Sequence, residues 1–285
     1  MTHTTTDGGV GPEAGPEAGT EAAPAAGTAA REDRTGGAVR AVSLAERPDL
    51  IGEAAAMPTA WTEFVLRSPV LAMAGWIFER YPEYQTVLVD GDGDGRVVAR
   101  AEAVPFPWDG DPESLPANGW DGALASAAQA AFAGEASAPP AVCLLEAAVV
   151  DGMRGRGLAA RMVDAVRGRM RDLGHRDLAA PVRPTGKEPG SGVGLAEYAA
   201  RVRGDGLPED PWLRLHVRMG ARITGVCPAS MTIGGGLAQW REWTGLPFDA
   251  DGPGEVPGGL GPVVADTAAD QAVYVEPNVW VHHRL

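Results

Sequence analysis

Glycine and arginine alternate in the segment Asp151-Gly152-Met153-Arg154-Gly155-Arg156-Gly157, which joins an apolar run to a helical pattern. Gly155 and Gly157 have no Cβ, so the backbone there can approach a ligand closely. Arg154 and Arg156 add positive charge, and the helix that follows presents unpaired N–H groups at its N-terminus. A pyrophosphate suits such a turn. The turn matches neither the dinucleotide-binding fingerprint, whose third glycine is missing, nor a Walker loop, because the chain has no Gly-Lys-Ser/Thr sequence.

A single carboxylate, Glu146, is the only charged side chain inside the apolar run 141–150. Burial raises the pKa of a carboxyl group, and a raised pKa suits a general base. The same glutamate could instead form a structural ion pair with an arginine on a neighbouring helix. The residues alone leave both interpretations open.

The elements around these residues follow from hydrophobic patterning. The apolar run 141–150 predicts a central buried strand. Apolar residues four positions apart predict a helix over 158–173, and 177–182 is the next predicted strand. Elsewhere we expect a mostly helical stretch over 41–80, a hairpin of strands 86–89 and 96–104, helices over 122–134, 195–202, 210–219 and 239–243, and strands over 220–233 and 272–283.

Composition excludes several classes of function. The net charge of −14 argues against general binding of nucleic acid or anionic membranes. No apolar run is long enough for a transmembrane helix, and no secretory signal is visible, so a cytoplasmic protein is expected. Two cysteines cannot make a disulfide framework, and no metal site is expected. Residues 152–183 hold eight Arg against three Asp, which indicates either a small anionic ligand or a solvated helix face.

The N-terminal segment differs from the rest of the chain. Residues 1–40 contain no Leu, Ile, Phe, Trp or Tyr. Such a segment cannot bury enough apolar surface to offset its ordering entropy. The sequence therefore predicts a disordered low-complexity tail over 1–40 and a single α/β domain over 41–285.

The segment from Val149 to Ala159 resembles the acyl-CoA loop of the GNAT superfamily of N-acyltransferases. In that family a strand, an Arg/Gln-x-x-Gly-x-Gly/Ala turn and a helix bind the CoA pyrophosphate. The resemblance implies a GNAT-like mixed, mainly antiparallel sheet that is flanked by helices and splays near the central strand. It also implies that the Val149 N–H stabilises the oxyanion. The implied donor-binding residues are Val149, Val150, Arg154, Gly155, Arg156, Gly157, Leu158 and Ala159.

The resemblance also implies a candidate acid. The family's usual donor of a proton to the leaving thiolate is a tyrosine four residues before a glycine, and His216 occupies that place before Gly220. An imidazolium can act as an acid, and a packed histidine is the alternative. Insertions at 105–135 and 234–270 are expected to shape the acceptor site, with Trp108 and Trp120 as candidate walls.

The function that follows is transfer of an acyl group, most simply acetyl, from acetyl-CoA to an amine of a small molecule by direct attack. Two alternatives stay open. An acyl carrier protein could supply the thioester in specialised-metabolite biosynthesis and dock on the arginine-rich surface. The chain could also be a non-catalytic module that binds acyl-CoA. The sequence fixes neither the acceptor nor the oligomeric state.

Overall fold

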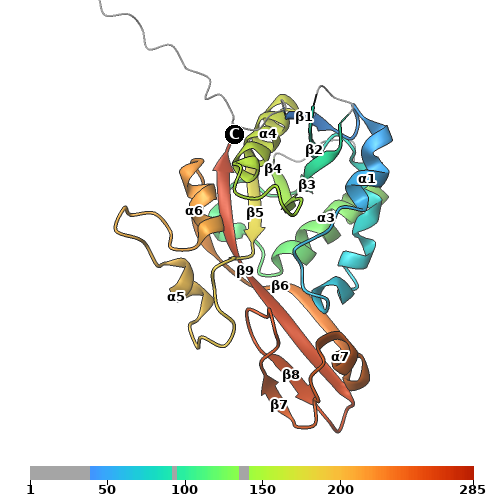
Figure 1. The fold of residues 1–285 in the computed structure, drawn as a ribbon, viewed down its shortest axis with the longest axis vertical. Coiled ribbons are helices and arrows are strands. Elements are labelled where there is room, and N and C mark those ends of the chain that lie inside the picture. Colours follow the sequence, from blue (N-terminus) through green and yellow to red (C-terminus); the bar gives the residue numbers. More distant parts are fainter. Residues whose placement is uncertain (1–38, 92–94, 135–140) are drawn as a thin grey trace, which may run out of the picture. The chain divides into compact units, whose positions relative to one another are not determined.

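The computed structural model describes residues 39–91, 95–134 and 141–285. A nine-stranded sheet has the order β1-β2-β3-β4-β5-β9-β8-β7, and β6 pairs with β9 outside this path (Figure 1). Among the described strands, only β4 and β5 run parallel, which confirms the mixed, mainly antiparallel sheet. The strands are β1 (Arg40–Ser43), β2 (Thr86–Val89), β3 (Val97–Phe106), β4 (Ala141–Val149), β5 (Asp177–Val182), β6 (Arg222–Gly236), β7 (Gly252–Gly254), β8 (Val263–Asp266) and β9 (Gln271–Arg284).

Helices flank this sheet. The long helix α4 packs against β2, β3 and β4, and α3 packs against β3 and β6. No helix within the described ranges is long and apolar enough to cross a membrane. The α-helices are α1 (Ile51–Ala55), α2 (Ile77–Arg80), α3 (Gly119–Ala133), α4 (Leu158–Asp172), α5 (Leu195–Ala199), α6 (Pro211–Arg218) and α7 (Leu237–Thr244). Short 3-10 helices are η1 (Pro48–Leu50), η2 (Val65–Arg67), η3 (Leu71–Trp76) and η4 (Pro112–Ser114).

The apolar stripe predicted for α4 faces the core. Leu158, Met162, Val166 and Met170 are all buried. The helix begins directly after Gly157, whose φ of 79° lies in the left-handed region that glycine tolerates best. Local sequence therefore sets both the start and the buried face of α4.

The sheet opens between β4 and β5. Their parallel pairing covers only Ala141 to Cys143 on β4 and Asp177 to Ala179 on β5. Beyond Cys143 the two strands diverge, which confirms the predicted splay. A bulge at Leu145 adds to the distortion, because Leu144 faces Ala103 while Glu146 faces Glu102. The Trp120 indole donates a hydrogen bond to the Leu145 carbonyl at 3.0 Å, which satisfies the bulged residue.

The N-terminal part of the domain departs from expectation. The stretch 41–80, predicted as mostly helical, begins with β1, which pairs antiparallel with β2. A four-residue strand is too short to show an alternating pattern, and it exists because β2 offers a free edge. Val39 is buried and Arg40 opens β1, although the sequence places both in the tail. Residues 1–38 of the predicted tail and residues 92–94 of the hairpin turn lie outside the described residues.

The acidic insertion 234–270 is more structured than its composition suggests. It includes the end of β6, all of α7, and the hairpin of β7 and β8, and β8 pairs with β9. Trp240 of α7 is fully buried, and its indole donates to the Ala272 carbonyl at 2.8 Å. Phe64 packs against both Trp240 and Tyr274, so the insertion shares the core of the domain.

Candidate active site

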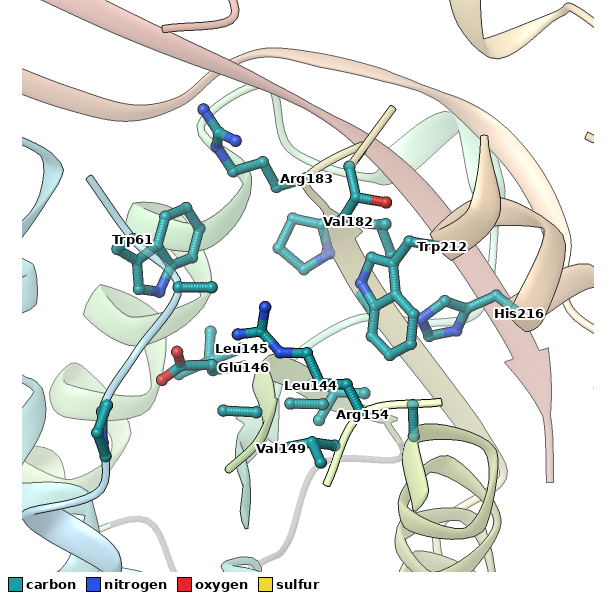
Figure 2. Close-up of a pocket in the computed structure, with 18 residues that line it drawn as sticks. Trp61, Leu144, Leu145, Glu146, Val149, Arg154, Val182, Arg183, Trp212 and His216 are labelled. Atoms are coloured by element: carbon teal, nitrogen blue, oxygen red, sulfur yellow. The ribbon is translucent and has the colours of Figure 1, made fainter. Parts of the chain in front are cut away.

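A pocket of about 450 Å³ lies where β4 and β5 diverge. Residues 144–149 of β4 and 180–183 at the end of β5 form two of its walls. Figure 2 shows Trp61 and Trp212 on opposite sides, with Arg183 at one end and with Glu146 and Arg154 toward the other. The splay of the sheet thus creates the pocket, and aromatic and charged side chains from distant segments line it.

The pocket collects part of the predicted site. Glu146, Val149, Arg154, Ala159 and His216 all line it. The remaining predicted residues belong to the turn and the start of α4 and are not part of its lining; these are Val150, Gly155, Arg156, Gly157 and Leu158.

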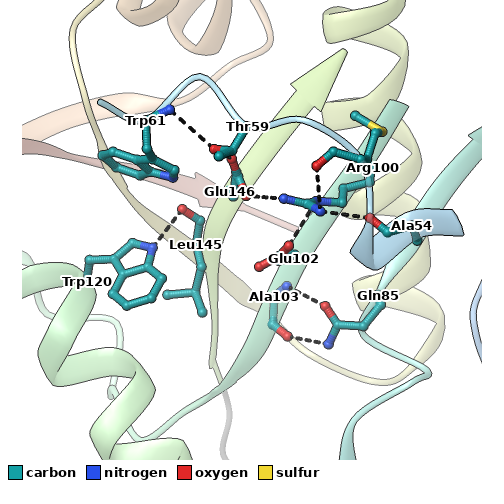
Figure 3. Close-up of polar contacts among 11 residues, drawn as sticks. Ala54, Thr59, Trp61, Gln85, Arg100, Glu102, Ala103, Trp120, Leu145 and Glu146 are labelled. Atoms are coloured by element: carbon teal, nitrogen blue, oxygen red, sulfur yellow. Dashed lines mark hydrogen bonds and ion pairs between the residues drawn. The ribbon is translucent and has the colours of Figure 1, made fainter. Parts of the chain in front are cut away.

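Glu146 is firmly held rather than free. The Thr59 hydroxyl donates to its Oε1 at 2.5 Å, and Arg100 donates through Nη2 to its Oε2 at 2.7 Å (Figure 3). The carboxylate side chain is 12% exposed, so it still reaches the pocket. Its arginine partner comes from β3 and not from a helix, which corrects that detail of the structural-pair interpretation.

Arg100 joins two carboxylates. Its Nε lies 2.9 Å from Glu102 Oε1, and its Nη1 donates to the carbonyls of Ala54 and Met57. Burial, reinforced by the negative charge of Glu146, raises the pKa of Glu102 to about 7. With both glutamates ionised, this Arg100 cluster (Arg100, Glu102, Glu146 and Thr59) carries an excess negative charge.

A second guanidinium–carboxylate cluster lies at the opposite end of the pocket. Arg183 follows β5, and its Nε is 2.7 Å from Oε1 of Glu276, which is completely buried in β9. Tyr274 and Asn278 both donate to Glu276. Burial raises the pKa of Glu276, and the charge of Arg183 opposes that rise. We refer to Arg183, Glu276, Tyr274 and Asn278 as the Arg183 cluster.

The backbone of β4 presents donors toward the gap. The Val150 N–H donates to the Val98 carbonyl of the adjoining strand at 3.0 Å. Hydrogen-bonded and non-hydrogen-bonded pairs alternate in an antiparallel ladder, so the N–H groups of Val149 and Ala147 point away from β3. The Val149 N–H thus points into the gap, whereas the Val150 N–H is used within the sheet.

The turn before α4 is open to a ligand. Gly152, Gly155 and Gly157 all have φ near +80°, at 82°, 79° and 79°. A Cβ at Gly155 or Gly157 would have no protein atom within 4 Å among the described residues. No side chain in the described part of the chain caps α4. The turn therefore leaves both space and unpaired N–H groups for an anion.

His216 lines the pocket but is deeply packed. Its Nδ1 lies 2.9 Å from Nε2 of His283, and its ring meets Trp212 edge-on at 4.7 Å between ring centroids. Burial lowers the pKa of His216 to about 4. The lowered pKa favours a neutral ring at pH 7, so this environment suits the packed-histidine alternative better than an imidazolium acid. Its Nε2 has no hydrogen-bond partner among the described residues.

Sequence reasoning missed Thr59, Trp61, Arg100, Arg183 and Trp212. Arg100 carried a usable signal, because a charged residue inside a predicted β-branched strand requires a partner. The other four lie in loops or on a helix with no distinguishing pattern.

The two tryptophans predicted as pocket walls pack elsewhere. Trp108 is buried and lies 4.8 Å from His282 between ring centroids. Trp120 supports the β4 bulge through its indole N–H. Neither lines the pocket, so Trp61 and Trp212 take the role expected of them.

Comparison with known proteins gives a consistent result. No protein-family model matches the chain. The arginine N-acetyltransferase avaD of Aspergillus versicolor is 30% identical over 275 residues, which cover 85% of this chain and 93% of that protein. The loading GNATL domain of CurA from Lyngbya majuscula superimposes with a TM-score of 0.51 and 16% identity, over 87% of this chain and 96% of that one. The GphF GNAT-like decarboxylase in complex with isobutyryl-CoA has a TM-score of 0.49 and 19% identity, over 87% of this chain and 98% of that one.

These similarities settle the family. The extent of the match to a named N-acetyltransferase does not favour the carrier-protein donor or the non-catalytic module. The CurA domain supports the same fold. The chain belongs to the GNAT superfamily of N-acyltransferases, enzymes that move an acyl group onto an amine.

Proposed function

We propose that residues 41–285 transfer an acetyl group from acetyl-CoA to a nitrogen of arginine or of a small molecule related to it. The observation that carries this proposal is the single pocket in which β4 N–H groups, Glu146 and the approach to α4 meet. The name of the arginine N-acetyltransferase relative supports the acyl group and the acceptor. Two buried, unpaired cysteines suit the cytoplasmic location that the sequence suggests.

The donor would bind along the opened edge of β4 and at the start of α4. Its pyrophosphate would accept hydrogen bonds from the backbone of Gly155, Gly157, Leu158 and Ala159, where no side-chain cap competes. Arg154 is 66% exposed and pairs with Asp151 at 3.0 Å, so it adds screened charge rather than a fixed contact. Arg156 would contribute in the same way.

The β4 backbone would stabilise the reacting carbonyl. As the amine attacks, a C–N bond forms and the carbonyl electron pair moves to oxygen. The N–H groups of Val149 and Ala147, directed into the splay, are the donors for that oxyanion. One such donor contributes about 3–4 kcal/mol to transition-state stabilisation in other enzymes.

Glu146 would receive the proton that the amine loses. Deprotonating an alkylammonium at neutral pH costs about 4–5 kcal/mol, and a positioned carboxylate supplies part of it. Arg100 and Thr59 orient this carboxylate toward the pocket. When the intermediate collapses, the C–S bond breaks and the thiolate takes up a proton, which balances the one that Glu146 removed from the amine. The neutral His216 ring lines the same pocket and could donate a hydrogen bond, though not its proton, to the leaving sulfur.

Turnover is tested by incubating the protein with acetyl-CoA and arginine. Free CoA is followed with a thiol reagent, and the product is identified by mass spectrometry. Release of CoA without an acetylated product would mean hydrolysis and would contradict transfer to an amine.

The donor site is tested by replacing Gly157. Gly157→Val should abolish CoA binding in calorimetry, because a side chain would fill the open space and resist φ = 79°. Gly168→Ala, inside α4 with free space around its Cβ, is the control and should bind normally. Arg156→Ala should weaken binding only about severalfold, and more at low salt. Normal binding by a folded Gly157→Val protein would remove the main support for the donor site.

A further inference from the structure

The Arg183 cluster combines a buried ion pair with an arginine that lines the pocket. Arg183 lines the pocket, and its side chain is 25% exposed. Its Nε faces Glu276, and its Nη2 donates to the Gly258 carbonyl. Its Nη1 has no acceptor within the described ranges. Two N–H donors of a fixed guanidinium are therefore available at one end of the pocket.

Glu276 explains why the guanidinium is fixed. A completely buried carboxylate is costly unless it is paired and hydrogen-bonded. Tyr274 and Asn278 supply donors on one side, and Arg183 supplies the charge on the other. The Tyr274 hydroxyl also accepts a hydrogen bond from the Leu260 N–H at 2.8 Å, which ties the cluster to the loop around Gly258. Arg183 is thus held by two contacts, with Glu276 and with the Gly258 carbonyl, and it also lines the pocket.

The opposite end of the pocket has the opposite character. Arg100 is shared by Glu102 and Glu146, so that end is negative or neutral. Trp61 and Trp212 lie on either side of the space between the two ends (Figure 2). Indole faces attract cationic and planar groups. The arrangement is complementary to a molecule that carries both a basic nitrogen and an anionic group.

We propose that Arg183 binds a carboxylate of the acceptor, with Glu276 as its positioning residue, so that the enzyme selects amino acids over the corresponding plain amines. This inference rests on the proposed function, because it assumes an amine acceptor in this pocket. It adds the requirement that the acceptor bears a carboxylate.

The experiment compares three acceptors: arginine, argininamide and agmatine. Argininamide keeps the skeleton and removes only the charge, whereas agmatine lacks the whole carboxylate. The α-amine of argininamide is less basic than that of arginine, and the terminal amine of agmatine is more basic. A loss of activity shared by both analogues therefore reports the missing carboxylate and not the basicity of the amine. For the wild-type enzyme we expect kcat/KM to be about 10–100-fold higher for arginine than for either analogue.

Arg183→Met should erase this preference. The KM for arginine should rise by about 10–100-fold, while kcat for arginine stays nearly unchanged. The kcat/KM values for argininamide and agmatine should also stay nearly unchanged. Glu276→Gln should raise the KM for arginine by a smaller factor and leave the kcat/KM values for argininamide and agmatine unchanged. If Glu276 were purely structural, the variant would instead have lower activity toward all three acceptors. Arg183→Lys should restore part of the preference. Arg154→Met, the matched change of the pocket's other exposed arginine, should leave the ratio between acceptors unaltered.

Three outcomes overturn the inference. The first is equal use of all three acceptors by the wild-type enzyme, and the second is a proportional loss of activity toward all three in Arg183→Met. If acetyl-CoA binds but none of the three amines is acetylated, the proposed acceptor is wrong and the role of Arg183 falls with it. Transfer without a carboxylate preference would instead retain the proposed function and remove only this inference.

Discussion

The two guanidinium–carboxylate clusters that flank the pocket use the same groups to opposite effect. In the Arg100 cluster, one guanidinium serves two carboxylates and two backbone carbonyls, so its donors are occupied by protein. In the Arg183 cluster, one carboxylate has two further donors of its own, so the guanidinium keeps capacity for a ligand.

The difference shows that the ratio of partners, and not the residue types, sets the character of each end. Arg100 is 8% exposed and neutralises charge inside the sheet. Arg183 is 25% exposed and can present charge to the pocket. A buried ion pair can therefore act as scaffold at one end of a site and as a recognition element at the other.

The largest expected effect comes from removing the carboxylate that faces the pocket. Glu146→Gln should lower kcat by about 10²–10⁴-fold with little change in the affinity for CoA. The amide keeps the shape of the side chain but cannot accept the proton. Steady-state kinetics and calorimetry with CoA measure the two quantities.

Glu63→Gln is the matched control, because Glu63 forms an exposed ion pair with Arg67 and does not line the pocket. It should leave kcat unchanged. Equal activity of wild type and Glu146→Gln at both pH 7 and pH 9 would exclude Glu146 as the base.

The next largest effect is expected on stability, from Glu102, the second carboxylate of the Arg100 cluster. The pKa of Glu102 rises from 4.5 to about 7 in the folded protein, so between these values the folded state binds a proton that the unfolded state has lost. The wild type therefore loses stability as pH rises through this window. Glu102→Gln lacks this titration, and its stability relative to wild type should increase by up to roughly 3 kcal/mol between pH 4.5 and 7.5.

Urea denaturation at several pH values measures this difference. Parallel stability curves for Glu102→Gln and wild type would show that Glu102 does not titrate in this range. The pH dependence of Glu63→Gln provides the reference for an exposed glutamate.

A smaller effect is expected in the Arg183 cluster from Tyr274→Phe. The change removes one donor to the buried Glu276 and the acceptor for the Leu260 N–H. The free energy of unfolding should fall by about 1–3 kcal/mol. Turnover of agmatine should be unaltered in the folded protein, because the analogue does not use this cluster. An unchanged denaturation midpoint would mean that Glu276 does not depend on Tyr274.

The smallest effect is expected from the exposed pair of Arg154 and Asp151. Its geometry resembles that of the buried pairs, at 3.0 Å, but Arg154 is 66% exposed. Asp151→Ala should change the free energy of unfolding by about 0–1 kcal/mol. A larger loss, measured by urea denaturation, would mean that exposure does not separate this pair from the two buried clusters.

The secondary structure near the site was predictable where local signals were strong. The strand bounds of β2 and β5 agree with expectation, and α4 begins at Leu158 as its periodicity requires. Asp210 caps α6 by accepting from the N–H groups of Trp212 and Leu213, as the Asp-Pro sequence suggests. The strand β1 was missed because pairing with β2, rather than its own four residues, creates it.

Only the part of the candidate site that is formed by backbone groups could be predicted from the sequence. Glycines with positive φ and a helix start are local features, so the turn before α4 could be located from the sequence. Partners of the charged side chains could not, because Thr59 is 87 residues from Glu146 and Arg100 is 46 residues from it. The low pKa of His216 was equally unpredictable, because it depends on burial of the ring, and the His283 ring that contacts it is 67 residues away in the sequence.

The sequence by itself determined the turn, the helix and the strand that present backbone donors to a ligand, because φ preference and hydrophobic period act over a few residues. Only the tertiary structure decided which charges meet. The divergence of β4 from β5 opens the pocket, the register of β3 on β4 sets Glu102 against Glu146, and β9 brings Glu276 to Arg183. The charge of a buried site depends on this long-range pairing, because a buried ion is tolerated only where a partner from another element reaches it.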